Sequence, residues 1–194
     1  MSFTDPSKLT ILVHEFFWFH VIKGYYRDFV KTLELKGDEK VLDFGCGPGA
    51  ASKFIASKLE EGGGELTCFD ISKKWIERAK KRLSRFSNVQ YYVEDIRKWD
   101  AKDKFYDSVV VHVMLHDIPL EERFRVVEAL AQKMKAGASL VIREPTKEGH
   151  GMRPEEIREL MERNNLKEKK SEIVKRSLLG AMYAGHFQKA SENA

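Results

Sequence analysis

Three glycines at alternate positions, Gly45, Gly47 and Gly49, follow an apolar stretch that carries a carboxylate at Asp43. Glycine permits positive φ and close backbone approach, so such a loop can lie flat against a bound ligand. Asp70 closes a second apolar stretch 21 residues after Gly49. This spacing suits a carboxylate that binds ribose hydroxyls. These residue types therefore predict a binding site for a nucleoside-like ligand.

The charge of Asp43 helps to choose between two ligands for this loop. The pattern Gly45-x-Gly47-x-x-Ala50 also matches the dinucleotide fingerprint, in which the third glycine can be alanine. That fingerprint places a pyrophosphate beside the loop and the helix N-terminus, and Asp43 would repel it. S-adenosylmethionine has a sulfonium, an ammonium, a single carboxylate and no phosphate, so an acidic loop entrance favours it. Capping of the loop by Asp43 is compatible with ligand binding as well.

Four motifs, in this order, resemble those of the class I S-adenosylmethionine-dependent methyltransferases. They are Asp43-Phe44-Gly45-Cys46-Gly47-Pro48-Gly49, Phe69-Asp70-Ile71-Ser72, Val93-Glu94-Asp95-Ile96 and Tyr106-Asp107-Ser108-Val109-Val110-Val111-His112. The resemblance extends from about residue 39 to residue 189. Within the family, the chain loosely resembles the small-molecule branch that includes the ubiquinone and menaquinone C-methyltransferases.

The resemblance implies which residues contact the cofactor. In the third motif of the family, an Asp contacts the adenine amino group and the next residue packs on the ring, which assigns these roles to Asp95 and Ile96. His112 is expected to line the cofactor pocket. The predicted cofactor-binding residues are Asp43, Phe44, Gly45, Cys46, Gly47, Gly49, Asp70, Ile71, Asp95, Ile96 and His112.

Methyl transfer is a displacement at carbon, so the main task of the protein is to align nucleophile and sulfonium. A general base is needed only if the acceptor must lose a proton early. His116, just after the fourth motif, is the best candidate for this catalytic role, and Asp117 can orient or charge it. The alternative is that His116 caps or packs the start of the next helix. His150 and His186 have no chemical partners in the sequence, and no cluster has metal-ligand spacing.

The expected methyl acceptor is a small, apolar or aromatic molecule. The basic residues of 73–85 are expected to form the polar side of one helix, so a nucleic-acid partner is not expected. The fourth motif also lacks the Asn/Asp-Pro-Pro-aromatic continuation of the enzymes that methylate amino groups of nucleic acids. Three alternatives stay open: methylation of protein or RNA, a cofactor-binding module without catalysis, and a nicotinamide-dependent oxidoreductase, which Asp43 opposes.

Size and composition indicate one globular domain. The chain has 194 residues, 42% of them hydrophobic, and 34 Lys and Arg against 30 Asp and Glu. Its two cysteines, Cys46 and Cys68, are expected to be packing residues in a reducing compartment. The apolar run 9–22 is shorter than the ~20 residues that span a bilayer and lacks a signal-peptide cleavage pattern. We therefore expect a cytoplasmic protein without a membrane span.

Short apolar stretches alternate with longer amphipathic ones, which predicts an α/β fold with a parallel sheet. The expected strands are 40–44, 65–69, 89–93, 108–113 and 139–143, and the expected helices 50–59, 73–84, 120–135 and 154–165. Gly62-Gly63-Gly64 and Ala136-Gly137 are expected to mark helix exits, and residues 167–189 a closing hairpin. Family resemblance implies a doubly wound, three-layer α/β/α arrangement with strand order 3-2-1-4-5-7-6 and strand 7 antiparallel.

The N-terminal region differs from the rest in its aromatic content. Residues 14–20 contain aromatic side chains on all sides of a helix, more than one packing stripe requires. We therefore expect residues 1–35 to form a helical cap or lid and residues 36–194 to form the S-adenosylmethionine-binding domain. Tyr25 and Tyr26 would then reach the methionine end of the cofactor. A buried helix or a homodimer contact is the alternative for this segment.

Overall fold

The computed structural model describes residues 23–176 and 180–191, which form two compact units that meet between Asp95 and Ile96 in the sequence. The aromatic segment 14–20 and the apolar run 9–22 lie outside the described residues. In the described part of the chain, no helix has the length and apolar character needed to cross a membrane. The two units are considered one after the other.

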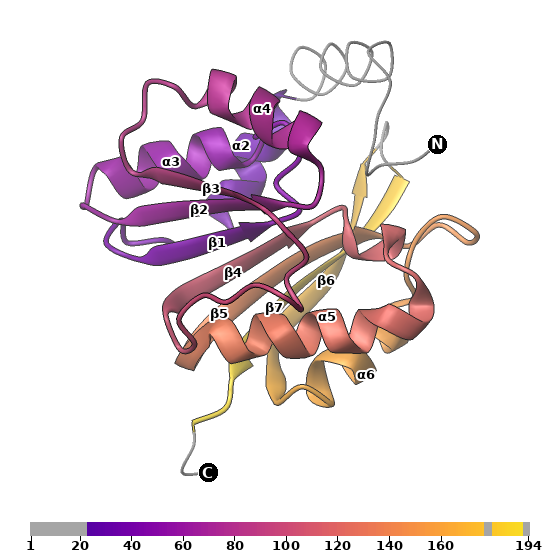
Figure 1. Cartoon of the computed structure of the whole chain (residues 1–194). Coiled ribbons are helices and arrows are strands. Elements are labelled where there is room, and N and C mark those ends of the chain that lie inside the picture. Colours follow the sequence, from indigo (N-terminus) through magenta and orange to yellow (C-terminus); the bar gives the residue numbers. More distant parts are fainter. Residues whose placement is uncertain (1–22, 177–179, 192–194) are drawn as a thin grey trace. The chain divides into compact units, whose positions relative to one another are not determined.

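Unit 1 is a three-stranded parallel sheet with helices packed on it (Figure 1). Its elements are α2 (Lys23–Lys31), β1 (Lys40–Phe44), α3 (Ser52–Glu60), β2 (Glu65–Asp70), α4 (Lys73–Arg82) and β3 (Val89–Val93). Helices α3 and α4 contact β2, and α2 contacts α3. The register pairs Phe44 with Phe69 and Asp70 with Val93. The carboxyl ends of the three strands therefore lie at one edge, where the first three motifs begin.

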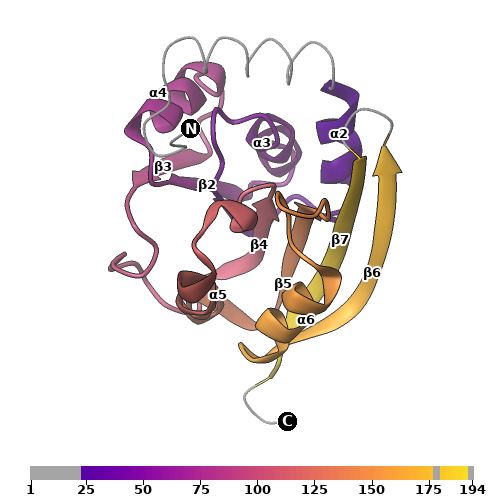
Figure 2. The ribbon, with the colours of Figure 1, turned by 90° about the vertical axis from the view of Figure 1, so that its right-hand side faces the viewer.

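Unit 2 combines a parallel strand pair with an antiparallel hairpin. Its elements are β4 (Tyr106–His112), a 3₁₀ turn η2 (Leu115–Asp117), α5 (Leu120–Lys133), β5 (Met134–Pro145), α6 (Pro154–Glu162), β6 (Leu166–Arg176) and β7 (Gly180–Lys189). Strand β4 is parallel to β5, whereas β7 is antiparallel to both β5 and β6. Helices α5 and α6 lie side by side (Figure 2).

The strand order is β3-β2-β1-β4-β5-β7-β6, with flanking helices. The predicted order and the antiparallel β7 are therefore confirmed. The central strands are long runs of Val, Leu, Ile and Phe because they are covered on both faces, as parallel strands in α/β proteins are. Val109, Val110, Leu140 and Ile142, for example, are fully buried.

Three predicted helices end earlier than expected. The helix expected over 73–84 ends at Arg82, and the one expected over 154–165 ends at Glu162. The helix expected over 120–135 ends at Lys133, and β5 begins at once with Met134. Gly137 has φ 74° and lies within β5, next to a shift in its register with β4. Its positive φ therefore belongs to an irregularity in β5, and Gly137 does not mark the end of a helix. The other expected exit is confirmed, since α3 ends at Glu60 and the N–H of Gly64 donates to the Leu59 carbonyl.

The glycines after α3 give a direct test of this packing. A Cβ on Gly64 would lie 2.6 Å from the carbonyl oxygens of Glu39 and Gly37, whereas Gly63, with φ 80°, faces open space. We expect Gly64→Ala to lower the free energy of unfolding by about 1–3 kcal/mol, as overpacking does. Gly63→Asn is the matched control, because Asn tolerates positive φ. Equal urea midpoints for wild type and Gly64→Ala would contradict this packing.

Candidate functional site

The glycine loop of unit 1 is shaped by three positive φ angles and fixed by its neighbours. Gly45, Gly47 and Gly49 have φ of 70°, 52° and 81°. The N–H groups of Gly45 and Cys46 donate to the Phe69 carbonyl at 2.8 and 3.1 Å. From α4, the Arg82 Nε donates to the Pro48 carbonyl at 2.9 Å. The loop is therefore held against the ends of β2 and α4 before any ligand arrives.

Asp70 connects the end of β2 to this loop. Its Oδ2 accepts a hydrogen bond from the Gly47 N–H at 2.9 Å, and its Oδ1 accepts one from the Ser72 N–H at 2.8 Å. Burial raises the pKa of Asp70, and these two hydrogen bonds oppose the rise because they stabilise the carboxylate. The structure thus brings together the two motifs from which the sequence predicted a nucleoside site.

Asp43 lies in β1 and is only 2% exposed. Its Oδ2 accepts a hydrogen bond from the Ser52 hydroxyl at 2.5 Å. Burial raises the pKa of Asp43 to about 6; the Ser52 hydrogen bond lowers it and the negative charge of Asp70 raises it further. Sequence reasoning missed Ser52, whose signal is a hydroxyl residue at the start of the helix that follows the loop. A nearby positive charge would stabilise the ionised form of this buried carboxylate.

Two exposed apolar side chains lie at the same edge of unit 1. Ile71, which follows Asp70 in the chain, is 56% exposed, and Val93, which pairs with Asp70 from β3, is 46% exposed. They are the only exposed large apolar side chains in the described part of unit 1. A Cβ on Gly47 would meet no atom within 4 Å, so the loop leaves open space there. This edge therefore combines carboxylates, a glycine backbone and apolar surface, which fits an adenosine-like group.

Other predicted residues are less accessible. The side chains of Phe44 and Cys46 are buried, and the Phe44 ring lies 5.9 Å from that of Phe69, so both pack in the core. Asp95 is half-buried, and Ile96, the first residue of unit 2, is only 3% exposed. Tyr25 and Tyr26 are buried in α2. Burial raises the pKa of Tyr26 well above 10, and the charge of Asp43 adds to this, so Tyr26 is electrostatically linked to the loop region.

In unit 2, His116 binds a carboxylate that sequence reasoning missed. Its Nδ1 lies 2.6 Å from Oε2 of Glu144 in β5, and its Nε2 lies 3.5 Å from Oδ1 of Asp117. Burial by itself would lower the pKa of His116, but the hydrogen bond to Glu144 and the charges of Glu144 and Asp117 raise it. Glu144 comes one residue after the expected strand 139–143. Like Asp70, it is a carboxylate at the end of a strand, and this position is the signal that could have identified it.

One of the two other histidines in this part of unit 2 differs from the expectation. His150 does have a partner, since its ring lies 5.1 Å from that of His116 in an edge-to-face arrangement. His112, expected to line the cofactor pocket, is half-buried, and burial together with the charge of Arg143 lowers its pKa to about 3. His112 is therefore neutral near pH 7, whereas the pKa of His116 is raised above its ordinary value.

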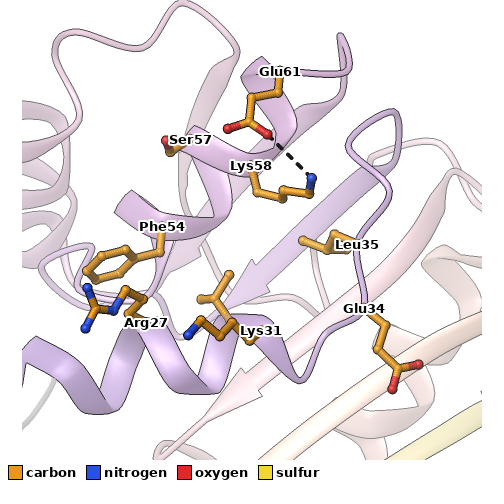
Figure 3. Close-up of a pocket in the computed structure, with 9 residues that line it drawn as sticks. Arg27, Lys31, Glu34, Leu35, Phe54, Ser57, Lys58 and Glu61 are labelled. Carbon is orange, nitrogen blue, oxygen red and sulfur yellow. Dashed lines mark hydrogen bonds and ion pairs between the residues drawn. The ribbon is translucent and has the colours of Figure 1, made fainter.

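A groove between α2 and α3 is a separate feature of unit 1. It has a volume of about 340 Å³ and is lined by Arg27, Lys31, Phe54, Lys58 and Glu61, among others (Figure 3). Lys58 is paired with Glu61 across 3.5 Å. None of the predicted site residues lines this groove, and its charges have both signs. It therefore has no part in the candidate cofactor site.

Comparison with known families identifies the class of this protein. The model of a family described as "Methyltransferase domain" matches residues 41–137, half of the chain and the whole glycine loop. The chain therefore belongs to this family, and its fold is that of the class I S-adenosylmethionine-dependent methyltransferases. S-adenosylmethionine is the cofactor of this class, as the sequence predicted.

Three curated relatives share about 30% identity with the chain. Carboxy-S-adenosyl-L-methionine synthase of Shewanella loihica is 29% identical over 110 residues, 55% of this chain and 44% of the relative. Protein-L-isoaspartate O-methyltransferase of Dictyoglomus turgidum is 32% identical over 114 residues, which are 58% of this chain and 46% of the relative. Demethylmenaquinone methyltransferase of Tropheryma whipplei is 29% identical over 112 residues, which are 58% of this chain and 44% of the relative. The chain thus spans less than half the length of each relative.

A solved structure extends the likeness of fold over most of the chain. The 1,6-didemethyltoxoflavin-N1-methyltransferase of Burkholderia thailandensis, with 1,6-didemethyltoxoflavin and S-adenosylhomocysteine bound, has a TM-score of 0.76 and 14% identity. The match covers 93% of this chain and 86% of that one. At this identity the likeness supports the fold.

Asp43 gives a prediction for pH dependence. Because its pKa rises from 3.8 to about 6 on folding, the folded state binds this proton more tightly than the unfolded state. Its contribution to stability is therefore complete below pH 4 and is lost as the pH rises through 6. Between pH 4 and 7 we expect wild type to lose up to about 3 kcal/mol of unfolding free energy relative to Asp43→Asn.

The two proteins can be compared by urea denaturation across this pH range. The amide of the Asp43→Asn variant retains an oxygen that can accept the Ser52 hydrogen bond, so the variant removes only the titration. Parallel pH curves for wild type and Asp43→Asn would show that the Asp43 pKa is not raised.

Proposed function

We propose that this protein transfers a methyl group from S-adenosylmethionine to a small-molecule acceptor, with the cofactor held at the glycine loop of unit 1. The observation that carries the proposal is the hydrogen bond from the Gly47 N–H to Asp70 Oδ2, which fixes a carboxylate beside an open glycine backbone. The bound cofactor supplies an electrophilic methyl group. The residues of the chain bind and orient it.

Each part of this edge has a proposed role. Asp70 accepts hydrogen bonds from the ribose hydroxyls, and Ile71 offers apolar surface to the adenine, which Asp95 recognises by its amino group. The backbone of Gly45, Gly47 and Gly49 allows the ligand to approach closely. Asp43, which is buried in β1, stabilises the positive charge of the ligand. Two buried carboxylates at one loop disfavour a pyrophosphate, and therefore a nicotinamide cofactor.

The small-molecule acceptor is supported by two of the proteins named above, the demethylmenaquinone methyltransferase and the enzyme with bound 1,6-didemethyltoxoflavin. The lid formed by residues 1–35, the homodimer and the cytoplasmic location stay predictions.

A second candidate function, methylation of RNA, is favoured by the charge of α4. Residues 73–85 contain seven Lys and Arg and one Glu, whereas the excess over the whole chain is only +4. Lys73, Lys80, Lys81 and Arg85 are exposed and make no ion pair with a described residue. Helix α4 also contacts the glycine loop through Arg82 and Pro48. A segregated basic face next to a cofactor loop fits a polyanion.

Calorimetry with Asp70→Ala tests the cofactor site. We expect wild type to bind S-adenosylmethionine and S-adenosylhomocysteine but neither NAD nor NADP. Asp70→Ala should weaken binding about 10- to 150-fold, because hydrogen bonds to a charged group contribute roughly 1.5–3 kcal/mol. Asp70→Asn should lose less affinity because its amide retains a hydrogen-bond acceptor. Asp95→Ala should also lose less affinity, because the adenine amino group offers only one contact.

Glu65→Ala is the matched control for these variants, since Glu65 is an exposed carboxylate at the opposite end of β2. It should bind the cofactor like wild type. Tight NAD binding without S-adenosylmethionine binding would overturn the proposed function, and wild-type affinity in Asp70→Ala would overturn the ribose role.

Fluorescence anisotropy with a labelled single-stranded RNA separates the two candidate functions. For a small-molecule enzyme, we expect the double variant Lys80→Glu/Lys81→Glu to bind RNA as weakly as wild type at about 150 mM salt. Tight wild-type binding that falls steeply with salt and is lost in this variant would instead establish the RNA function. Lys167→Glu/Lys169→Glu, which reverses two exposed charges on β6, is the control for net charge.

A further inference from the structure

The groove between α2 and α3 lies entirely within unit 1 and is separate from the candidate cofactor site. Two helix faces border it, because the lining residues of both helices recur at i, i+3 and i+4 spacing, which places side chains on one face. These residues are Arg27, Val30 and Lys31 on α2 and Phe54, Ser57 and Lys58 on α3. The two helices contact each other, so the groove is a feature of one compact unit.

Part of the lining of this groove is apolar. Val30 is only 8% exposed, and Leu35 and Phe54 are half-buried. The volume of about 340 Å³ is near the lower end of the range for small-molecule pockets. A groove of this size and composition fits a ligand with one flat ring and a short chain.

Arg27 is the lining charge for which the described residues supply no partner. The Lys58 Nζ lies 3.5 Å from Oε2 of Glu61, and the Lys31 Nζ lies 3.8 Å from Oδ1 of Asp28. Arg27 is exposed and makes no ion pair or hydrogen bond with any residue in the described ranges 23–176 and 180–191. The described part of the chain therefore leaves one positive charge at the groove without a counter-charge.

Figure 3 shows how these groups are arranged. The guanidinium of Arg27 and the ring of Phe54 lie at the same end of the groove, whereas the Glu34 carboxylate points away from both. A guanidinium presents its N–H donors in a planar fork that matches a carboxylate. Lys31, one turn further along α2, adds a second positive charge, and like charges at i,i+4 spacing repel, which a bound anion would relieve. This end of the groove therefore fits an acid that carries a flat apolar group.

We propose that this groove is a second ligand site of unit 1 and that it binds a small aromatic carboxylate. The ring of the ligand packs against Phe54 and Val30, and its carboxylate accepts hydrogen bonds from Arg27. A carboxylate fits better than a phosphate ester, because its single negative charge matches Arg27, while Glu34 and Glu61 in the lining repel a dianion more strongly. The site is independent of the proposed methyl transfer, since none of the proposed cofactor-binding residues lines it.

A nitrogen-15 HSQC titration of the full-length protein with phenylacetate tests the site. We expect saturable shifts at Arg27, Lys31 and Ser57, while the amides of Gly45 and Gly47 stay unchanged. Phenylacetamide keeps the ring without the charge and should bind about 3- to 10-fold more weakly, since an ion pair at an exposed guanidinium contributes only modestly. Acetate keeps the charge without the ring and should bind at least about 10-fold more weakly, because the apolar contact is lost.

Variants on the two sides of the groove assign the contacts. Arg27→Gln should weaken phenylacetate binding about 3- to 10-fold. Phe54→Leu should weaken it about 2- to 10-fold, because leucine keeps an apolar side chain but loses the aromatic pair. Lys53→Gln, which removes an exposed charge of α3 outside the lining, is the matched control and should bind like wild type. The spectrum of each free variant shows whether it is folded, and if Phe54→Leu is not, Arg27→Gln and the amide ligand decide.

The site is overturned by an absence of saturable shifts at millimolar phenylacetate, by wild-type affinity in Arg27→Gln, or by an equal loss of affinity in Lys53→Gln and Arg27→Gln. Shifts centred on Gly45 and Gly47 would also overturn it, because the ligand would then lie at the cofactor loop. Calorimetry measures cofactor binding separately, so failure of this site and failure of the proposed function can be told apart.

Discussion

The burial of carboxylates at the carboxyl ends of parallel strands is the constraint on which both candidate sites depend. A buried carboxylate is costly unless hydrogen-bond donors surround it. In unit 1 the donors are the Gly47 and Ser72 N–H groups for Asp70 and the Ser52 hydroxyl for Asp43. These donors belong to the turn after β1 and to the starts of α3 and α4. Satisfying the carboxylates therefore shapes the same backbone that would bind the ligand.

Unit 2 also buries a carboxylate at the end of a strand, but its donors are of a different kind. Glu144, at the end of β5, is satisfied by two N–H groups and the ring of His116. In unit 1 the donors are mostly backbone groups, which do not titrate, so the carboxylates stay available for a cation or for hydroxyls. In unit 2 one donor is an imidazole, which does titrate. Similar strand ends therefore hold a buried carboxylate in both units, with different kinds of donor.

The sequence predicted the strand order and the glycine loop because both depend on local signals. Alternating apolar stretches indicate the α/β class, family resemblance supplies the order, and Gly45, Gly47 and Gly49 adopt the positive φ that only glycine takes readily. The sequence did not identify Ser52 or Glu144, because their partners are distant in the chain. The nearest carboxylate in sequence, Asp117, was expected to orient His116, but the carboxylate that accepts the hydrogen bond from its ring is that of Glu144, 28 residues away.

The most direct test of the ligand site is a nitrogen-15 HSQC titration of the assigned protein with S-adenosylhomocysteine. Binding at the loop predicts that the largest amide shifts fall on Gly45, Gly47 and Ile71, whereas residues that line the groove between α2 and α3, such as Lys31 and Lys58, stay unchanged. Saturable shifts centred on that groove, or no shifts at millimolar ligand, would contradict a cofactor site at the glycine loop.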